Sequence, residues 1–423
     1  MKGAEALARA IRAGTDRQYT VPGFPVTELG TLTGAELVIN EKTALEYALG
    51  DSLSGQRVAV IIKNVGVNAC ADPLAQASVQ GIEKGIILVV GDDPEAKGSQ
   101  TAQDSRYYGE LAELPVIEPD DETCFTGVES ALEASERFSR VAMLRLTHYL
   151  LDAEISGTPV PRHQGKGKLA DKSWTMHGRV TAAEETYRTM FMWSEMSPLN
   201  QWKGGILGAG PAPGVSRLVT VNPVPERVAS FPKVNEYGRS FVQDHRTHAP
   251  PAQQERPESL EERGFGRTFC AVCPYKPLLG ILREKGMRLI CDAGCSVFVM
   301  NPPYELGIAS YGMGSSIAVA ARSTHVALIG DYALLHSGLN ALIDVYEKRL
   351  SLLCIVMSNH CAAMTGGQPV SNPARYIDWA DPEICPAEDE SRLRDIIRYP
   401  DGPLTVVVEA QCPKGAHHET VEY

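Results

Sequence analysis

Two stretches of the chain alternate short, wholly apolar runs with helix-like segments, and this alternation constrains the fold more than any other feature. A run that is apolar at every position is typical of a strand covered on both faces, as in parallel sheets. Residues 1–150 contain three largely apolar runs, and helical patterns over 40–49 and 74–82 each precede one of them. The runs are Val58–Ile62 and Ile86–Val90, which are apolar throughout, and Val141–Leu146, which carries one charged residue, Arg145. We therefore expect an α/β domain with a parallel sheet over 1–150.

The same alternation returns at Phe265 and continues to the end of the chain. It predicts helices over 276–284, 314–321 and 337–348 and strands over 287–291, 325–330, 352–358 and 404–409. Residues 151–264 are rich in Pro, Gln, His and charged side chains, which indicates an irregular linker or docking region with a helical piece over 182–192. The prediction is thus two α/β domains, 1–150 and 265–423, joined by the irregular region 151–264.

Three tryptophans fall in this middle region, namely Trp174, Trp193 and Trp202. Aromatic residues are enriched in the energetically important parts of interfaces, which makes them candidate anchors of a docking surface. A role in a hydrophobic core is an equally good interpretation.

Composition narrows the possible partners and the compartment. The 423 residues carry 40 Lys and Arg against 52 Asp and Glu, a net charge of -12. This balance argues against binding to nucleic acid or to an anionic membrane surface. No apolar run reaches the roughly 18 residues that span a bilayer, and residues 1–12 do not resemble a signal peptide. We expect a cytoplasmic protein, in which ten cysteines favour metal binding or catalysis over disulfides.

Two of the predicted strands end in residues that can bind a metal ion. The strand over 325–330 is followed by Asp331, and the strand over 352–358 is followed by Asn359. Ligands of open parallel sheets bind at the carboxyl ends of the strands, so these oxygen ligands can meet on one Mg²⁺ ion. Gly330 would let a diphosphate approach the backbone at the start of the next helix. An Asp at this position is, however, more often only a helix cap.

The sequence around these residues resembles that of a known family. Gly330-Asp-Tyr followed by Asn359 resembles the thiamine diphosphate motif, and His336-Ser-Gly338 with Ala363–Pro369 resembles the large subunit of indolepyruvate ferredoxin oxidoreductases. The resemblance covers about 1–150 and 265–423 and includes several further segments in the same order. They are Val21–Glu28, Lys63–Pro73, Gly91–Pro94 and Ser99–Tyr108.

This resemblance implies a role for each part of the chain. The first domain would bind the pyrimidine and the last domain the diphosphate, with the active site between domains of one or two chains. Asp331, Asn359 and the backbone carbonyl of Cys361 would hold Mg²⁺, and His336 would be catalytic. The remaining residues implied to line the cofactor are Gly312, Met313, Gly314, Gly330 and Thr365.

Activation of thiamine diphosphate requires a carboxylate against its aminopyrimidine ring, so that the amino group can act as an internal base. Glu41 lies where a predicted strand leads into a helix, in an Asn-Glu-Lys segment that resembles the family. A glutamate at a helix start also has an ordinary role, because it favours the helix dipole or completes a capping box.

Four cysteines have spacings suited to a [4Fe–4S] cluster. Cys270 and Cys273 form a CxxC motif, Cys295 follows a glycine, and Cys412 follows the last predicted strand. A zinc site or ordinary core cysteines remain alternatives. Cys291 and Cys385 compete with Cys412 as fourth ligand. The others, Cys70, Cys124, Cys354 and Cys361, are expected to be buried small apolar residues.

The resemblance implies the catalytic subunit of a 2-oxoacid oxidoreductase, with aryl pyruvates among the possible substrates. Oxidative decarboxylation would yield an acyl-CoA and pass electrons to the cluster. The expected partners are a small 2-oxoacid oxidoreductase subunit and an iron–sulfur chain, around a dimeric core, because the sequence lacks the ferredoxin-like tail of longer family members. The alternatives are a non-oxidative thiamine diphosphate-dependent decarboxylase and a catalytically silent scaffold.

Overall fold

The computed structural model describes residues 1–94, 96–101, 103–195, 202–203, 206–207, 210–213, 253, 255–413, 415 and 417–423. The chain divides into two compact units. The first comprises 1–170 and 180–256, and the second comprises 171–179 and 257–423. No helix in the described residues is both long enough and apolar enough to cross a membrane.

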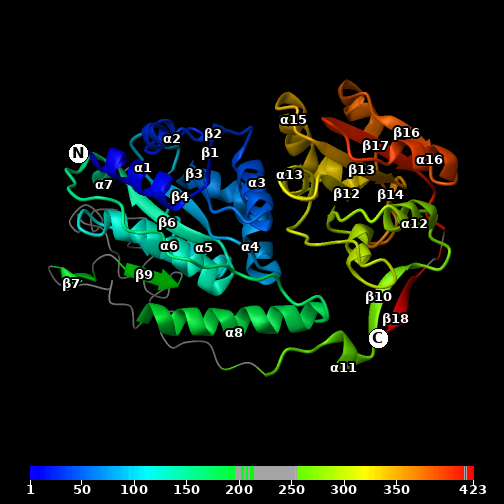
Figure 1. Ribbon diagram of the computed structural model, residues 1–423, viewed down its shortest axis with the longest axis horizontal. Coiled ribbons are helices and arrows are strands. Elements are labelled where there is room, and N and C mark those ends of the chain that lie inside the picture. The colour runs from blue at the N-terminus through cyan, green and yellow to red at the C-terminus, as the bar shows by residue number, and fades with distance from the viewer. Residues whose placement is uncertain are drawn as a thin grey trace. The chain divides into compact units, whose positions relative to one another are not determined.

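The first unit is built on a seven-stranded sheet with the order β2-β1-β3-β4-β6-β5-β9 (Figure 1). The strands from β1 to β6 run parallel to their neighbours, and β9 pairs antiparallel with β5. The bounds are β1 Arg17–Thr20, β2 Glu36–Leu37, β3 Val58–Lys63, β4 Ile86–Asp92, β5 Pro115–Glu118, β6 Ala142–Thr147 and β9 Gly210–Pro213. A short hairpin of β7 (Trp202–Lys203) and β8 (Ile206–Leu207) also belongs to this unit.

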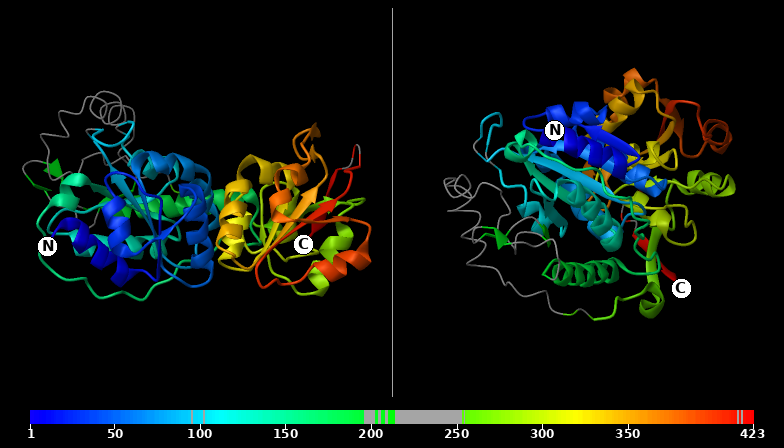
Figure 2. Two further views of the ribbon diagram at one scale, coloured as in Figure 1. Left: turned by 90° about the horizontal axis from the view of Figure 1, so that it is seen from above. Right: turned by 60° about the vertical axis from the view of Figure 1, so that its left-hand side comes forward.

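Helices cover both faces of this sheet (Figure 2). Ala59, Ile61 and Val89 pack in one hydrophobic cluster with residues of α1 and α6. The alternating residues Val58 and Val60 are equally buried, so the second face is covered as well. The bounds are α1 Gly3–Gly14, α2 Thr27–Thr33, α3 Glu41–Leu53, 3₁₀ helix Asn64–Cys70, α4 Ala71–Gln80, α5 Tyr107–Leu111, α6 Cys124–Phe138, α7 His148–Asp152 and α8 Met176–Glu195.

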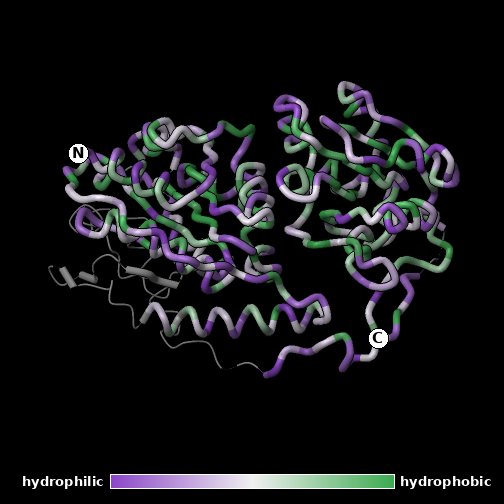
Figure 3. The backbone as a smooth tube through the Cα atoms, in the orientation of Figure 1, coloured by the Kyte–Doolittle hydropathy of each residue, from purple (hydrophilic) through white to green (hydrophobic). Residues whose placement is uncertain are grey.

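The second unit has a five-stranded, wholly parallel sheet with the order β11-β12-β13-β17-β16. Its central strands are mostly apolar, as the tube in Figure 3 shows, and their core residues lie on both faces. The strands are β11 Ile290–Cys291, β12 Val326–Gly330, β13 Leu352–Ser358, β16 Glu383–Pro386 and β17 Pro403–Glu409. Two antiparallel pairs accompany them: β10 Phe265–Cys270 with β18 His418–Glu422, and β14 Cys361–Ala362 with β15 Gln368–Pro369.

The helices of the second unit follow the strands in α/β order. They are α11 Leu260–Arg263, α12 Lys276–Glu284, 3₁₀ helix Cys295–Met300, α13 Ser316–Ala321, α14 Asp331–Ala333, π-helical turn Leu334–Gly338, α15 Leu339–Glu347, 3₁₀ helices Pro373–Tyr376 and Asp378–Ala380, and α16 Glu390–Ile396.

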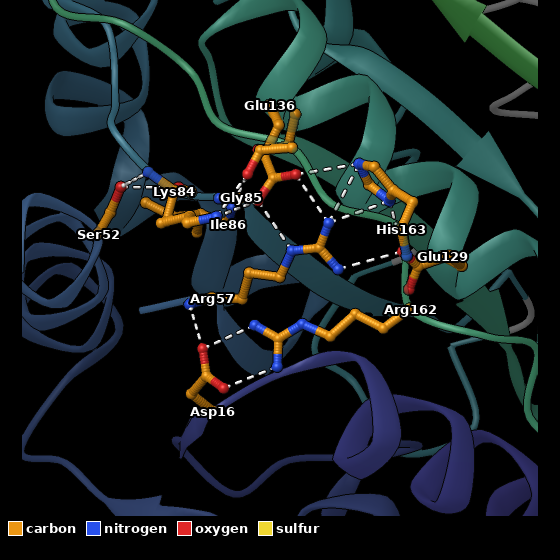
Figure 4. A network of polar contacts seen from close by, with 12 residues as sticks. Asp16, Ser52, Arg57, Lys84, Gly85, Ile86, Glu129, Glu136, Arg162 and His163 are labelled. Atoms are coloured by element: carbon orange, nitrogen blue, oxygen red, sulfur yellow. Dashed lines mark hydrogen bonds and ion pairs between the residues drawn. The ribbon is translucent and has the colours of Figure 1, made fainter. Parts of the chain in front are cut away.

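A buried polar network fastens an extended segment of the first unit to the sheet (Figure 4). Arg57, at the start of β3, is 1% exposed and donates two hydrogen bonds to Glu136, at 2.8 and 2.7 Å, and one to Glu129 at 3.1 Å. His163 lies against the same guanidinium group, with its backbone N–H on Glu129 at 2.9 Å. Arg162 beside it pairs with Asp16 through two hydrogen bonds, of 2.7 and 2.9 Å.

The structure confirms most of the predicted elements and revises three of them. The strand expected over 287–291 is reduced to β11, Ile290–Cys291. The helix expected over 337–348 begins at Asp331, directly after β12, because a π-helical turn connects α14 with α15. The helix expected over 182–192 is α8, which has 20 residues, so the middle region is less irregular than its composition indicates.

The predicted middle region has no boundary of its own in the structure. Residues 151–170 belong to the first unit and 257–264 to the second. Trp193 packs edge-on against Phe138, with ring centroids 5.2 Å apart, which supports a core role for this tryptophan. Trp174 lies in an isolated bridge with Ser259, and the side chain of Trp202 lies outside the described residues.

Candidate functional site

The ends of β12 and β13 meet at the carboxylate of Asp331. This side chain is 2% exposed. Its Oδ2 accepts hydrogen bonds from the backbone N–H groups of Asn359 at 3.0 Å and His360 at 2.7 Å, and its Oδ1 accepts from Tyr332 at 2.7 Å. The Asn359 Oδ1 in turn accepts from the backbone of Cys361 at 3.1 Å. The predicted magnesium ligands therefore lie together at the carboxyl edge of the second sheet.

The electrostatics of Asp331 reflect both its burial and these donors. Burial raises the pKa of this carboxyl group, and the N–H groups of His360, Tyr332 and Asn359 act in the opposite direction. A buried carboxylate at a strand end, held in place by backbone donors, suits a divalent cation that also binds diphosphate oxygens.

The glycines predicted to line the cofactor belong to a tightly held loop. Gly312 and Gly314 have φ angles of 103° and 79°, which other residues rarely adopt. A Cβ atom at Gly314 would lie 2.6 Å from the backbone nitrogen of Gly338. The backbone carbonyl of Met313 accepts a hydrogen bond of 2.6 Å from Ser337. The loop thus packs closely on the π-helical turn that carries His336.

Asp292 organises this loop, and it was not among the predicted site residues. Its fully buried carboxylate accepts hydrogen bonds from the backbone N–H groups of Ala293 at 3.0 Å, Gly314 at 2.8 Å and Ser316 at 3.1 Å. The available signal was its position directly after the apolar run that ends at Cys291, which matches the position of Asp331 after its own strand.

His336 lies on the turn against which this loop packs, whereas Thr365 lies in a separate hairpin turn. His336 is exposed on the π-helical turn, and its ring lies 5.8 Å from that of Tyr332. Thr365 is exposed in the turn between β14 and β15, where its hydroxyl group contacts Ala362 and Gln368 at 3.3 and 3.2 Å. Gly330 has open space around its Cα.

Glu41 lies at the carboxyl edge of the first sheet, as the first residue of α3. The Asn40 side chain caps this helix through a 2.8 Å hydrogen bond from Thr43, so Glu41 is not needed as the cap. Its half-buried carboxyl group lies directly against Gly66: a Cβ atom there would be 2.5 Å from the Glu41 Oε1. The backbone carbonyl of Glu41 accepts a hydrogen bond from the thiol of Cys70 at 3.4 Å.

Five cysteines of the second unit gather in one region. Burial and the neighbouring thiols of Cys412, Cys273, Cys270 and Cys361 raise the pKa of Cys295 to about 12. Burial and three of the same thiols raise that of Cys412 to about 11. The sequence placed Cys361 among the buried apolar cysteines, and this was wrong, because its thiol is half-buried and belongs to this group.

The other cysteines lie in the cores. Cys291 and Cys385, the predicted competitors for the fourth ligand position, are fully buried, with their thiols on the backbone carbonyls of Ala309 and Pro386 at 3.4 Å. Cys70, Cys124 and Cys354 are buried, as predicted.

Tyr275 connects the cysteine group with the strand-end site. It is 4% exposed, and burial, Asp331, Cys273, Cys412 and Cys361 all raise its pKa. Its hydroxyl group has no hydrogen-bond partner among the described residues. A buried hydroxyl group without a partner is costly, so its position fits a bound group that supplies an acceptor.

His418 is a further neighbour that the sequence did not indicate. Its Nε2 lies 3.4 Å from the Cys295 sulfur. The pairing of β18 with β10, which sets His418 opposite Cys270, brings it there.

The oxygen donors at the strand ends fit a Mg²⁺ ion, and the thiols of the cysteine group fit a [4Fe–4S] cluster. No three His, Cys, Asp or Glu side chains within the described ranges are arranged to hold a single metal ion. A Mg²⁺ ion bound with a diphosphate needs only one or two carboxylates, and a [4Fe–4S] cluster spreads its thiolates over separate irons. Deprotonating several close thiols is unfavourable unless a positive charge compensates, as iron does.

Comparison with known proteins gives the relationship. Residues 292–383 match the family model described as thiamine pyrophosphate enzyme, C-terminal TPP binding domain. This match begins at Asp292 and includes Asp331 and Asn359. The chain is 26% identical to indolepyruvate oxidoreductase subunit IorA of Methanothermobacter thermautotrophicus, over 94% of this chain and 79% of the relative. It is 27% identical to the subunit of the same name from Archaeoglobus fulgidus, over 87% and 75%.

A solved structure supports the fold. The crystal structure of a candidate thiamin diphosphate-dependent enzyme from Mycobacterium smegmatis superposes with a TM-score of 0.57 at 13% identity, over 96% of this chain and 99% of that one. The two parallel-sheet units thus share the fold of that protein, and the second unit contains the matched TPP binding domain. The chain is a thiamine diphosphate-dependent oxidoreductase subunit similar to indolepyruvate oxidoreductase subunit IorA.

Proposed function

We propose that this subunit catalyses the oxidative decarboxylation of a 2-oxoacid, aryl pyruvates included, to an acyl-CoA. Two electrons leave one at a time through a [4Fe–4S] cluster in the second unit. Bound thiamine diphosphate supplies the electron sink for loss of carbon dioxide. The names of the relatives, which refer to indolepyruvate, support the substrate class.

The second unit holds the diphosphate end of the cofactor in this proposal. The Asp331 carboxylate, the Asn359 side chain and the backbone carbonyl of Cys361 bind Mg²⁺, which neutralises the diphosphate charge. Gly330, where a Cβ atom would meet nothing within 4 Å, leaves the backbone open to the cofactor, and the closely packed loop of Gly312, Met313 and Gly314 lines it. Thr365, in the hairpin turn between β14 and β15, lines the cofactor, and His336, on the π-helical turn of the same unit, is the catalytic histidine.

The first unit supplies the activating carboxylate. The Glu41 carboxylate would bind the aminopyrimidine ring of the cofactor, whose amino group would then supply an internal base. Gly66 supports this role because it leaves space for the carboxyl group.

The gathering of thiols is the observation that favours an oxidoreductase over the non-oxidative decarboxylase. Cys270 and Cys273 share one segment and Cys295 and Cys412 come from two others, yet the thiols lie close enough to raise one another's pKa. A decarboxylase that releases an aldehyde has no need of such a group. We assign these four as cluster ligands.

The chain acts with partners in this proposal. The relatives are named as subunits, which supports a complex with a small 2-oxoacid oxidoreductase subunit and with an iron–sulfur chain, built around a dimeric core. The net charge of -12 gives no support to a nucleic-acid partner.

Spectroscopy of anaerobically purified protein tests the proposal. We expect about four irons and four sulfides per chain and an EPR signal on reduction with dithionite, all lost in Cys270→Ser and retained in Cys124→Ser. Iron-free wild-type protein that still releases carbon dioxide from a 2-oxoacid would contradict the oxidoreductase and support the decarboxylase.

A calorimetric titration tests the cofactor site. Asp331→Ala should abolish Mg²⁺-dependent binding of thiamine diphosphate. Because Asp331 also binds three backbone N–H groups, Asn359→Ala is the second variant, with thermal melting as a check on folding. Unchanged affinity in both variants would place the metal elsewhere.

A further inference from the structure

Cys361 lies beside Cys412 although the two are far apart in sequence. Strands β13 and β17 are parallel neighbours with Ser358 opposite Glu409, and the Ala410 N–H donates to the Ser358 carbonyl at 3.1 Å. The two segments therefore leave the sheet side by side. Each cysteine lies three residues beyond the same pair. Where the two strands pair they are about 4.8 Å apart, so the two segments leave the sheet at a separation like the roughly 4.4–6.8 Å between the Cα atoms of a disulfide.

The side chains agree with this placement, because the Cys361 thiol lies against the thiol of Cys412. Both thiols are half-buried and thus accessible to a small oxidant, whereas Cys354, on the same strand as Cys361, is fully buried.

We propose that Cys361 and Cys412 form a disulfide when Cys412 is not bound to the cluster, which makes the pair a redox modification site. The inference rests on the proposed function only in so far as Cys412 is a cluster ligand. With a peroxide as oxidant, one thiolate attacks the O–O bond to give a sulfenic acid and water. The second thiol then displaces a second water, so two thiols and one hydrogen peroxide yield one disulfide and two waters.

Such a bond has two consequences. It removes one of the four cluster ligands, so the oxidised chain cannot rebuild the cluster until a dithiol reduces it. It also ties the segment after Asn359, which belongs to the proposed magnesium site, to the segment after Glu409. Oxidation of a cluster ligand would thus also restrain the segment that carries the proposed magnesium ligands of the same unit.

Peptide mapping of the full chain tests the pairing. Iron-free protein is treated with hydrogen peroxide, alkylated and digested with trypsin. We expect one cross-linked pair, residues 350–375 with 399–414, which contain Cys354, Cys361 and Cys412. The pair should persist in Cys354→Ser and disappear in Cys361→Ser. A cross-link of Cys412 to Cys270 or Cys273, or none at all, would overturn the proposal.

Cluster reconstitution gives an independent readout. After peroxide treatment, wild-type protein should take up iron and sulfide only once a dithiol has been added, whereas Cys361→Ser should do so without it. Equal behaviour of the two would overturn the proposal. Thermal melting verifies that Cys361→Ser is folded, with Cys361→Ala as second variant. If no form binds iron, the proposed function fails, while the mapping still decides the disulfide.

Discussion

At the scale of single residues, the position of Glu41 depends on the absence of a side chain at Gly66. A methyl group there would meet the end of the Glu41 side chain at 2.5 Å. Since this end is flexible, Gly66→Ala should displace the carboxyl group rather than unfold the unit. We expect turnover to fall on the order of 100-fold, as displacements near 1 Å can cause. Gly280→Ala, in a helix with open space, is the control.

Replacing the carboxyl group itself separates binding from activation. Glu41→Gln keeps the size of the side chain but cannot carry the charge that drives deprotonation of the cofactor. We expect thiamine diphosphate to bind with unchanged affinity by calorimetry, while carbon dioxide release falls at least tenfold. Near wild-type turnover would contradict the role of Glu41. The exposed Glu5→Gln in α1 is the matched control.

Asp104 gives the first unit a defined acid response. Its burial raises its pKa, but Arg106 and Arg145 outweigh this and hold the pKa at about 2, against 3.8 for an ordinary aspartate. A lowered pKa stabilises the folded state above about pH 4, and this contribution is lost as the pH falls to about 2. It amounts to roughly 2 kcal/mol.

The measurement compares urea unfolding of wild type and Asp104→Asn from pH 2 to pH 7. The difference in unfolding free energy should be largest at neutral pH and shrink below about pH 4. Burial raises the pKa of Asp92 and Glu118 nearby, which has the opposite sign, so only the difference isolates Asp104. A difference that does not vary with pH would contradict the prediction. The exposed Asp121→Asn is the control.

At the scale of elements, the extended segment around His163 is held by one buried cation. Arg57 is 1% exposed, and its guanidinium group contacts Glu136, Glu129 and His163 together. Arg57→Met would leave the buried Glu136 with Lys84, 3.9 Å away, in place of two guanidinium hydrogen bonds, which costs about 3–5 kcal/mol. Arg162→Met breaks a pair that is about one-third exposed on both sides and should cost below about 1 kcal/mol. Urea unfolding and limited proteolysis after Arg162 or Lys166 measure the difference, and equal effects would contradict it.

At the scale of the whole molecule, the cysteines suffice for one cluster. Five gather in the second unit, and the other five are buried in the cores. Electron transfer to an external carrier needs a series of closely spaced centres, so the isolated chain should decarboxylate a 2-oxoacid but reduce ferredoxin poorly. Native mass spectrometry of the complex should find a small subunit and an iron–sulfur subunit. A homodimer with full acceptor activity would contradict this.

Local sequence determined most of the fold, because its signals act over short distances. The apolar runs over 58–62, 86–90 and 352–357 became central strands, since a run without polar residues is stable only when both faces are covered. Asp331 and Asn359 could be expected to meet for the same reason, as parallel strands end at one edge.

Tertiary structure alone decided which distant groups share a site. Sequence spacing could not bring Cys361 to Cys412, because their proximity follows from the pairing of β13 with β17. Asp292, Tyr275 and His418 lack a motif of their own and acquire roles only through burial and strand pairing. The importance of Gly66 follows only from the Glu41 side chain that packs on it. Such contacts join residues that no local pattern connects, so only the packed chain determines them.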